Sequence, residues 1–570
     1  MNIQIGLCQI NPVVGALEEN CSRILDAAKR AVDQGAVVLA FPELVLSGYP
    51  PEDLILKRHF IEDCWHYLEK LASELPTEAI SFVGAPHLID GRVFNVAAVI
   101  TGGHIVAIYQ KMILPNYGVF DEKRVFAPGR IPLIIQAGAA RIGIHICEDS
   151  WYRNEDAVQL LKETRLDLLL NLSASPYHRG KRHLREKTLR DTANFLNCPL
   201  AYCNMVGGQD ELVFDGGSMI IGADGSVLAR APQFQEDLLL ASLTSTPTTT
   251  FTPESEPPLR RIVHTPMPPS RNHTPSAESR IEPLLDDLTE VYSALQTGLR
   301  DYVNKNGFRK TVIALSGGID SALVAAIAVD TLGPDRVAGV TMPSQYSSAG
   351  TREDAEQLAI NLGIEFFSLP IESIFHAFLA ELLPVWEGLP PDVAEENLQA
   401  RIRGNIIMTL SNKFNWLVLT TGNKSELATG YCTLYGDMVG GYALIKDVPK
   451  MLVYELARWR NQAGVVIPPT TIDRPPSAEL RPDQADTDSL PPYDVLDAII
   501  ERYVERDMGV DAIVGDGYDP ETVKQVSRLI DLSEYKRRQG APGVKITPKA
   551  FGRDRRMPIT NAYRERVKGA

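Results

Sequence analysis

One octapeptide, Leu315–Ala322, constrains the fold of this 570-residue chain more than any other segment, and it reads Leu-Ser-Gly-Gly-Ile-Asp-Ser-Ala. It follows a strand-like run, Thr311–Leu315, and precedes a helix-like run from Asp320 to Leu332. A strand that turns through two glycines into a helix exposes several backbone N–H groups at the positive end of that helix, and such a turn holds phosphate. An ordinary Gly-rich turn is the alternative interpretation. The sequence therefore predicts a phosphate-binding turn in the second half of the chain.

Strand and helix patterns alternate on both sides of this turn. The sequence predicts strands at 310–315, 336–342, 364–369 and 416–419, and helices at 320–332, 351–362 and 395–411. Alternating β and α elements with short connections imply a parallel, doubly wound, Rossmann-like sheet. Ligands of such sheets bind at the carboxyl ends of the strands, which is where Ser316 lies.

The first 243 residues form a second series of short apolar strands and helical stretches, which indicates a separate layered α/β domain. Its predicted strands include 36–41, 141–147, 167–172 and 200–204. A change to Pro, Thr, Ser and Arg predicts a linker at 244–283, because a segment such as Thr244–Pro253 cannot build a core. The other domain then spans 284–570, and its Pro- and Asp-rich segment 473–492 is expected to be a mobile loop or lid.

Composition argues against several functional classes. The net charge of −15 disfavours a nonspecific nucleic-acid binder and a binder of anionic membranes. The sequence has no run of about 18 apolar residues, and its first residues lack a basic signal-peptide region, so neither a membrane span nor export is expected. Seven widely spaced cysteines predict a reducing cytoplasm, and the absence of CxxC and HExxH makes a structural zinc site improbable.

Three segments of the first domain carry groups suited to amide hydrolysis. Cys147 ends a predicted strand and is followed by two acids, Glu43 lies at the tip of another strand, and Lys111 precedes a Pro-containing turn. A buried core thiol is the alternative interpretation of Cys147, since that is the usual fate of cysteine. In this order and setting, the three residues resemble the nitrilase, or carbon–nitrogen hydrolase, superfamily across residues 1–243. The resemblance implies a four-layer αββα sandwich.

The trio also makes chemical sense as a thiol nucleophile with its helpers. A thiol is weak until it is deprotonated, and Glu43 can take the thiol proton and later deliver it to the leaving ammonia. Lys111 can stabilise the oxyanion together with a backbone N–H that follows Cys147. Glu122 is a candidate carboxylate that orients Lys111, with a solvated surface charge as the alternative.

The glutaminase branch of this superfamily implies glutamine contacts at Tyr117, Ser175 and Lys181. Lys181 is the candidate partner of the substrate α-carboxylate, although basic neighbours such as His178 are also compatible with a solvated loop. Trp151 is a weaker candidate, which core packing would also explain.

The Ser-Gly-Gly-Ile-Asp-Ser string departs from the Walker A pattern, which ends in Lys and Ser/Thr. It resembles the ATP pyrophosphatase, or PP-loop, family, whose members cleave ATP between the α and β phosphates. Asp320 in this loop and Glu426 in the later segment Leu419–Glu426 supply two oxygen ligands for Mg²⁺. Adenylyl transfer needs such a pair, because charge on the triphosphate must be neutralised as pyrophosphate leaves.

The order of the motifs SGGIDS, TGNKSE, YGD and VPK resembles the NAD synthetases, and with the nitrilase-like domain the resemblance is to the glutamine-dependent family over essentially the whole chain. It implies ATP as co-substrate with Mg²⁺, and glutamine and deamido-NAD as the other substrates. One departure is Leu434, where ammonia-only synthetases place a lysine. Solvated lysines are the alternative for two of the implied contacts, Lys450 and Lys536. The implied ATP contacts are Ala314, Leu315, Ser316, Gly317, Gly318, Ile319, Asp320, Ser321, Thr421 and Lys450, and the implied deamido-NAD contacts are Asn397, Glu426 and Lys536.

The implied reaction has two centres. Cys147 releases ammonia from glutamine, and ATP activates the nicotinic acid carboxylate of deamido-NAD, which ammonia then converts to the amide. A sheltered ammonia tunnel and a homo-oligomer are expected, with no nucleic-acid or membrane partner. Two alternatives remain: another glutamine amidotransferase of the ATP pyrophosphatase family, and a nitrilase-type amidase with a regulatory nucleotide-binding domain. Asn2 stands where asparagine synthetases need a cysteine, and the intact Asp320 and Glu426 pair counts against a merely regulatory domain.

Overall fold

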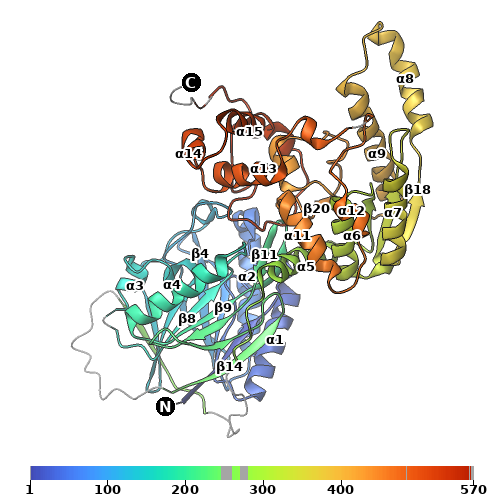
Figure 1. The fold of residues 1–570 in the computed structure, drawn as a ribbon. Coiled ribbons are helices and arrows are strands. Elements are labelled where there is room, and N and C mark those ends of the chain that lie inside the picture. The colour runs from blue at the N-terminus through green and yellow to red at the C-terminus, as the bar shows by residue number, and fades with distance from the viewer. Residues whose placement is uncertain are drawn as a thin grey trace. The chain divides into compact units, whose positions relative to one another are not determined.

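The computed structural model describes residues 2–162, 164–244, 260–269, 280–482, 484–563 and 565. The chain divides into two compact units (Figure 1). The first comprises Met1–Gln209 and Val213–Leu285, and the second comprises Asp210–Leu212 and Asp286–Ala570. Within the described ranges, no helix combines the length and the apolar character that crossing a bilayer requires.

Two β-sheets form the centre of the first unit. The six-stranded sheet has the order β14-β1-β2-β3-β4-β5, and the seven-stranded sheet has the order β13-β12-β9-β8-β7-β6-β15. Their inner faces share one buried apolar core, which includes Ile3 and Val38 from the first sheet and Ile142 and Leu170 from the second. The strands are β1 (Asn2–Gln9), β2 (Val38–Ala40), β3 (Ile80–Ile89), β4 (Arg92–Thr101), β5 (His104–Gln110), β6 (Leu133–Ala137), β7 (Ala140–Ile146), β8 (Leu168–Ser173), β9 (Leu200–Asn204), β12 (Met219–Ile221), β13 (Val227–Arg230), β14 (Asp237–Thr244) and β15 (Arg261–Thr265), with β10 (Val206–Gln209) and β11 (Leu212–Asp215) forming a separate pair.

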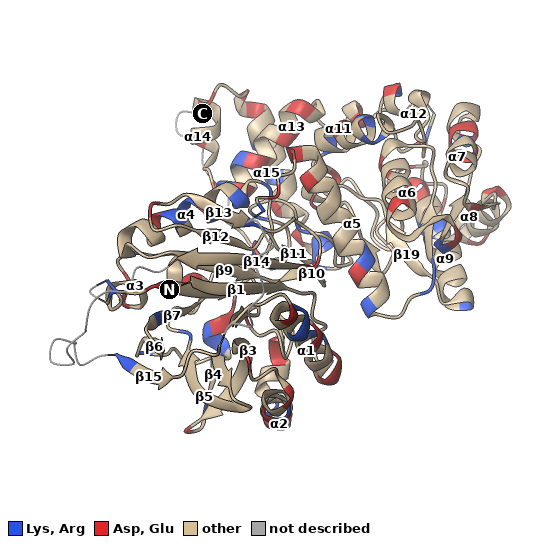
Figure 2. Ribbon diagram, turned by 90° about the horizontal axis from the view of Figure 1, so that it is seen from below, with Lys and Arg blue, Asp and Glu red and all other residues tan. Residues whose placement is uncertain are grey.

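Helices cover the outer faces of both sheets and complete four layers. On one side lie α1 (Leu17–Asp33) and α2 (Arg58–Glu74), and on the other lie α3 (Asp156–Gln159) and α4 (Lys181–Leu196). α1 buries Ile24, Ala28 and Val32, a spacing of four that places them on one helical face. Figure 2 shows charged residues gathered on α1 and α2, whereas the strands are almost free of charge. The predicted αββα sandwich is confirmed.

The predicted linker at 244–283 is described only in part, and that part differs from the prediction. β15 pairs in parallel with β6, with Ile262 opposite Ile134. The β-branched Ile262 and Val263 favour a strand between the Pro-rich stretches, because such side chains suit a pleated surface. The segment predicted as a linker therefore contains a strand at 261–265, whereas its positions 245–259 and 270–279 lie outside the described residues.

The second unit contains a five-stranded sheet with the order β18-β17-β16-β19-β20, and every pair in it is parallel. The predicted doubly wound sheet is confirmed. Its strands are β16 (Thr311–Ala314), β17 (Val337–Thr341), β18 (Glu365–Ser368), β19 (Leu417–Thr420) and β20 (Tyr442–Ala443). Its helices are α5 (Asp287–Lys305), α6 (Ile319–Leu332), α7 (Ala349–Leu362), α8 (Glu372–Trp386), α9 (Val393–Phe414), α10 (Lys424–Thr429), α11 (Lys450–Asn461), α12 (Pro469–Asp473), α13 (Tyr493–Ile500), α14 (Val510–Gly515), α15 (Pro520–Leu532) and α16 (Glu534–Arg537).

The strand order reverses at β16, and this reversal positions the site. The chain runs from β16 outward through β17 to β18, and then returns to place β19 on the other side of β16. Thr311 is in register with Leu417, so the segments that follow β16 and β19 emerge at the same sheet edge. In doubly wound sheets, a ligand crevice opens at such a switch point.

Two candidate active sites

The first unit buries a cluster of three titratable side chains, Glu43, Lys111 and Glu122. Lys111 Nζ donates hydrogen bonds to Glu43 Oε1 at 2.6 Å and to both carboxylate oxygens of Glu122 at 2.8 Å. The three side chains are at most 5% exposed. Burial by itself would lower the pKa of Lys111, but the Glu122 and Glu43 carboxylates outweigh it and raise that pKa, so the ammonium group stays charged. Burial also raises the pKa of Glu122.

Among the described residues, the hydrogen bonds of Glu43 leave one acceptor position of its carboxylate open. Its Oε1 accepts from Lys111 and, at 2.7 Å, from Asn95 Nδ2. Its Oε2 accepts from the backbone N–H of Ala174 at 3.0 Å. A carboxylate oxygen accepts two hydrogen bonds, so Oε2 retains one lone pair that can take a proton.

Cys147 follows β7 at the first position of a short 3₁₀ turn, Cys147–Ser150. Its φ of 46° lies in the left-handed region, which is uncommon for a non-glycine residue and is typical of strained functional turns. Burial raises the pKa of the Cys147 thiol well above its usual value, and the charge of Glu43 adds to this while Lys111 opposes it. The thiol is therefore neutral in this structure, and it needs a base at the moment of attack.

Asp149 ties this turn to the segment that follows Lys111. Its carboxylate accepts hydrogen bonds from the backbone N–H groups of Ile113 at 2.7 Å and of Ile146 at 3.0 Å. The hydroxyl of Tyr109 donates to it at 2.8 Å. The buried Asp149 thus fixes the nucleophile relative to the lysine, a role that its place in the motif did not predict.

A second chain of hydrogen bonds supports the nucleophile from behind. Asn171 Nδ2 donates to the carbonyl of Cys147 at 2.9 Å and to Ser150 Oγ at 2.7 Å. His145 Nε2 donates to the carbonyl of Ala157 at 3.0 Å, so its Nδ1 accepts from Ser150 Oγ at 2.9 Å. Burial lowers the pKa of His145 to about 4, and the ring is therefore neutral near pH 7.

Two of the predicted glutamine contacts, Tyr117 and Lys181, lie beside residues that follow Cys147. The Tyr117 hydroxyl donates to Glu148 Oε1 at 2.7 Å. Lys181 Nζ donates to the carbonyl of Pro176 at 2.7 Å and lies 5.8 Å from the centre of the Trp151 ring. Lys181 is buried, so the solvated-loop alternative for it is wrong.

Ser175 lies close to the same cluster through its neighbour in sequence, Ala174. Its backbone N–H donates to Asn204 Oδ1 at 2.9 Å. Behind it, Arg185 forms two hydrogen bonds of 2.8 and 2.9 Å with Asp215, and Arg185 Nη2 reaches the carbonyl of Ser175 at 3.4 Å. A buried ion pair therefore fixes the backbone at this predicted contact.

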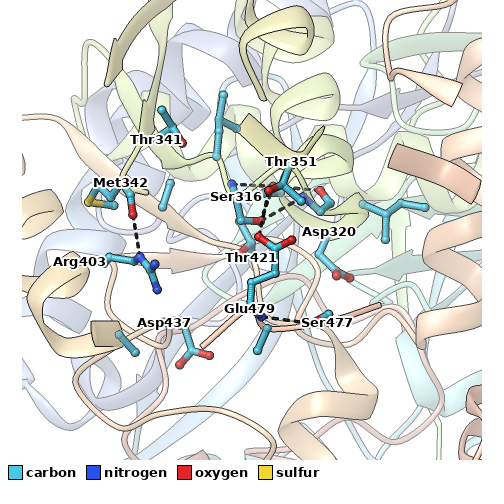
Figure 3. A pocket seen from close by; sticks show the side chains of 18 of the residues that line it. Ser316, Asp320, Thr341, Met342, Thr351, Arg403, Thr421, Asp437, Ser477 and Glu479 are labelled. Carbon is cyan, nitrogen blue, oxygen red and sulfur yellow. Dashed lines mark hydrogen bonds between the residues drawn. The ribbon is translucent and has the colours of Figure 1, made fainter. Parts of the chain in front are cut away.

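The second unit has a deep pocket at the carboxyl edge of its sheet (Figure 3). The whole predicted loop, Ala314–Ser321, lines it together with Thr421, Glu426 and Lys450. Gly317 has a φ of 81°, and a Cβ atom there would lie 2.1 Å from the carbonyl oxygen of Thr351. Only glycine fits this position, so the turn is more than a flexible connection.

Two carboxylates converge on one ammonium group in this pocket. Lys450 Nζ lies 2.5 Å from Asp320 Oδ2 and 3.5 Å from Glu426 Oε1. Burial and the charge of Asp320 raise the pKa of Glu426 to about 8. Burial by itself would lower the pKa of Lys450, but these two carboxylates raise it. Both carboxylates therefore reach one cationic position, and their oxygens fit the hard oxygen set that Mg²⁺ prefers alongside phosphates.

The segment predicted as a loop at 473–492 contributes part of the wall of this pocket. Positions 474–480 and Asp486 line the pocket, whereas position 483 lies outside the described residues. Glu479 Oε2 accepts from Thr351 Oγ1 at 2.9 Å, as Figure 3 shows, and Arg474 Nη2 donates to Asp354 at 2.6 Å. Two side-chain contacts thus hold this wall against α7.

Asn397 and Lys536, two predicted deamido-NAD contacts, lie behind another part of the wall. Lys536 Nζ donates to the carbonyls of Gly430 at 2.6 Å and of Cys432 at 2.7 Å. Asn397 Oδ1 accepts from Thr433 Oγ1 at 2.6 Å. Both residues therefore hold the segment 430–433, of which Tyr431 and Thr433 line the pocket.

Several residues of the two sites were missed by the sequence reasoning. Asn95 sits in the middle of a buried strand, where a polar residue is itself a signal. Asp437 lies within the quoted Tyr-Gly-Asp motif, lines the pocket, and has a pKa that burial raises to about 6. Arg403 donates from Nε to the carbonyl of Met342 at 2.9 Å, and nothing in the helical pattern around it marked this contact.

Comparison with known proteins agrees with this division of the chain. The family model described as carbon-nitrogen hydrolase matches residues 4–250, and the one described as NAD synthase matches residues 291–540. The glutamine-dependent NAD(+) synthetase of Thermotoga maritima is 47% identical and covers 99% of both chains. That of Synechocystis is 44% identical over 98% of this chain and 99% of its own.

A solved structure gives the same result at the level of the fold. The glutamine-dependent NAD+ synthetase from Acinetobacter baumannii, in complex with adenosine diphosphate, is 40% identical and has a TM-score of 0.75. The match covers 99% of this chain and 100% of that one. Such full-length similarity argues against both alternatives that the sequence left open.

Proposed function

The chain belongs to the glutamine-dependent NAD(+) synthetases, and from that premise we infer which of its residues carry each half of the reaction. The enzyme hydrolyses glutamine to ammonia and uses ATP to adenylate and amidate deamido-NAD, giving NAD, AMP and pyrophosphate. We assign glutamine hydrolysis to the first unit and amide synthesis to the second.

In the first unit, Cys147 is the nucleophile that attacks the side-chain amide of glutamine. The open lone pair of Glu43 Oε2 accepts the thiol proton as the C–S bond forms. The Lys111 ammonium group stabilises the developing oxyanion, and Glu43 then protonates the departing ammonia. Water attacks the resulting thioester with Glu43 as base, and glutamate leaves.

The buried Glu43–Lys111–Glu122 cluster beside Cys147 is the observation that carries this assignment. A permanently charged lysine at most 1% exposed is costly unless it serves chemistry or is fully paired, and here two carboxylates pair it. The Glu122 carboxylate accepts hydrogen bonds from Lys111 at 2.8 Å and from the Tyr49 hydroxyl at 3.0 Å. We assign Glu122 the role of holding Lys111 in place.

Glutamine itself is recognised by Tyr117, Ser175 and Lys181. Lys181 provides the cation for the α-carboxylate, since its ammonium group is buried beside the Trp151 ring. In this structure Lys181 donates to the carbonyl of Pro176, and Tyr117 donates to Glu148, which directly follows Cys147 in sequence.

In the second unit, the pocket at the switch point binds ATP through the turn Ala314–Ser321 with Thr421 and Lys450. The nicotinic acid carboxylate of deamido-NAD attacks the α phosphorus, pyrophosphate leaves, and ammonia displaces AMP from the acyl adenylate. Asn397, Glu426 and Lys536 are assigned to deamido-NAD. Asn397 and Lys536 have an indirect role in this assignment, because their side chains hold the segment 430–433 in place.

Asp320 and Glu426 are the residues that would hold Mg²⁺ in this pocket. Their convergence on Lys450 Nζ supports the assignment, because oxygens that share one cationic partner also suit a divalent ion. A bound Mg²⁺ supplies charge neutralisation of the triphosphate. Lys450, placed between the same carboxylates, is positioned to contact a phosphate.

We also propose that the protein works as a homo-oligomer. Ile374, Phe378 and Leu383 of α8 are 40%, 42% and 65% exposed, although Leu, Ile and Phe usually seek burial. A second copy of the chain would cover them. Light scattering after gel filtration measures the mass, and a monomer at micromolar concentration would contradict the proposal.

The division of labour is tested by changing the nitrogen source. Cys147→Ala should abolish NAD formation from glutamine and retain formation from added ammonium at alkaline pH, where free ammonia is available. Asp320→Asn should impair both. A well-folded Cys147→Ala protein that ammonium does not rescue, or an Asp320→Asn protein as active as wild type, would refute the corresponding assignment.

A further inference from the structure

We propose that Asn423 is a positioning residue that links the two carboxylates of the second site, an inference that rests on the proposed metal role of Asp320 and Glu426. Asn423 is the residue directly before α10, and its side chain is completely buried. It contacts both carboxylate-bearing residues, which come from different strand-to-helix connections more than 100 positions apart.

The first half of the link is a helix cap. Asn423 Oδ1 accepts from the backbone N–H of Glu426 at 3.0 Å, and the backbone N–H of Asn423 donates to Glu426 Oε2 at 3.3 Å. This reciprocal capping box orients the Glu426 side chain toward the start of the helix. A Ser or Asp at this position could accept in the same way.

The second half of the link needs an amide. Asn423 Nδ2 donates to Asp320 Oδ1 at 2.9 Å, while Asp320 Oδ2 is the oxygen that contacts Lys450. The two hydrogen bonds fix the orientation of the amide. Rotating it by 180° would turn the amide nitrogen toward the N–H of Glu426, donor against donor, and the amide oxygen toward the carboxylate of Asp320, acceptor against acceptor. Only a side chain with an acceptor and a donor can serve both partners here.

The first turn of α10 is held rigidly around Asn423. Lys424 Nζ lies 2.7 Å from Glu505 and 3.0 Å from Asp447, and it is fully buried. Ser425 Oγ accepts from the backbone N–H of Lys450 at 2.9 Å. Three consecutive residues thus anchor to three other segments, so the amide cannot easily follow Asp320 if that carboxylate moves.

The consequence is that the donor on Asn423 sets the direction of Asp320 Oδ2 toward the cationic position. Groups that hold metal ligands in place typically change metal affinity by about 10- to 100-fold when they are removed. Asn423→Ser keeps the capping acceptor and removes the donor. Asn423→Ala removes both, and should lower the affinity equally while also losing the cap.

The experiment measures Mn²⁺ binding by electron paramagnetic resonance, with the full-length chain and a non-hydrolysable ATP analogue. We expect Asn423→Ser to raise the Kd for Mn²⁺ about 10- to 100-fold with a melting temperature close to that of wild type. The matched cap control is Asp519→Ala, since Asp519 Oδ2 accepts from Thr522 N at 2.8 Å at the start of α15, away from this pocket. It should lower the melting temperature and leave the Kd unchanged.

Asp320→Asn separates failure of this inference from failure of the metal site. A Kd within twofold of wild type for Asn423→Ser, while Asp320→Asn loses Mn²⁺, would overturn the positioning role alone. If Asp320→Asn also leaves the Kd for Mn²⁺ unchanged, the metal assignment itself is overturned. A Kd that rises for Asn423→Ala and not for Asn423→Ser would show that the cap, and not the donor, matters.

Discussion

Replacing Glu122 by glutamine tests the role of the buried cluster most directly. The change keeps the size and shape of the side chain but removes its charge. In the wild-type protein Lys111 has two carboxylate partners, Glu43 at 2.6 Å and Glu122 at 2.8 Å, and in the variant only Glu43 remains. The amide oxygen can still accept one hydrogen bond, but the amide nitrogen cannot, because it would face the Lys111 donors.

The expected loss follows from the number of bonds. Lys111 loses one hydrogen bond to a charged acceptor, which contributes about 1.5–3 kcal/mol. Each 1.36 kcal/mol in the barrier is about tenfold in rate, so kcat/KM for glutamine hydrolysis should fall about 10- to 150-fold if the bond acts fully in the transition state. Synthesis from ammonium should be unchanged, because Glu122 belongs to the first unit.

Steady-state kinetics with glutamine and with ammonium, each with saturating ATP and deamido-NAD, measure both quantities. A matched control is Glu186→Gln on α4, which removes a charge paired with Arg190 at 2.5 Å and Arg230 at 2.8 Å in the same unit. That control should leave both activities within about twofold of wild type. Glutamine hydrolysis by Glu122→Gln that matches the control would refute the orienting role, and an equal loss with ammonium would refute the assignment to one unit.

Three further outcomes are expected. Gly317→Ala should abolish binding of an ATP analogue in calorimetry, because its Cβ would lie 2.1 Å from the carbonyl of Thr351, whereas Gly318→Ala meets its nearest atom at 3.2 Å and should weaken binding by less than tenfold. The pKa of His145 falls to about 4 in the folded state, so the folded state binds fewer protons than the unfolded state, and the free energy of unfolding decreases as the pH drops below 6.5. Urea unfolding should show that His145 lowers the free energy of unfolding by about 2 kcal/mol between pH 7 and 5, and His145→Gln should lack that part of the loss. Lys181→Met should reduce kcat/KM for glutamine about 10- to 150-fold without changing the rate with ammonium, and an unchanged KM for glutamine would contradict its contact with the α-carboxylate.

Much of the fold was predictable from local patterns. Alternating β and α runs after Leu284 specify a parallel doubly wound sheet, because crossover connections between parallel strands have one favoured hand. The strand at 261–265 was missed, since its β-branched Ile262 and Val263 are a weak local signal among Pro-rich stretches and its pairing with β6 is a long-range contact.

The candidate sites were predictable to the extent that motifs carry chemistry. Cys147, Glu43 and Lys111 lie in separate segments, and their residue types and order pointed to one reaction. Their partners Asn95 and Asp149 were not found, because a single Asn or Asp in a buried strand or turn has many structural explanations.

The sequence by itself determined which groups the chain can offer: a thiol after a strand, a Gly-Gly turn before a helix, and carboxylates near strand ends. These follow from short-range rules of backbone geometry, so they can be read along the chain. Only the tertiary structure decided which groups meet. Lys111 lies between Glu43 and Glu122, because burial forces each charge there to find a partner. Asn423 lies between Asp320 and Glu426, because the parallel strands β16 and β19 end at the same edge of the sheet although they are far apart in sequence.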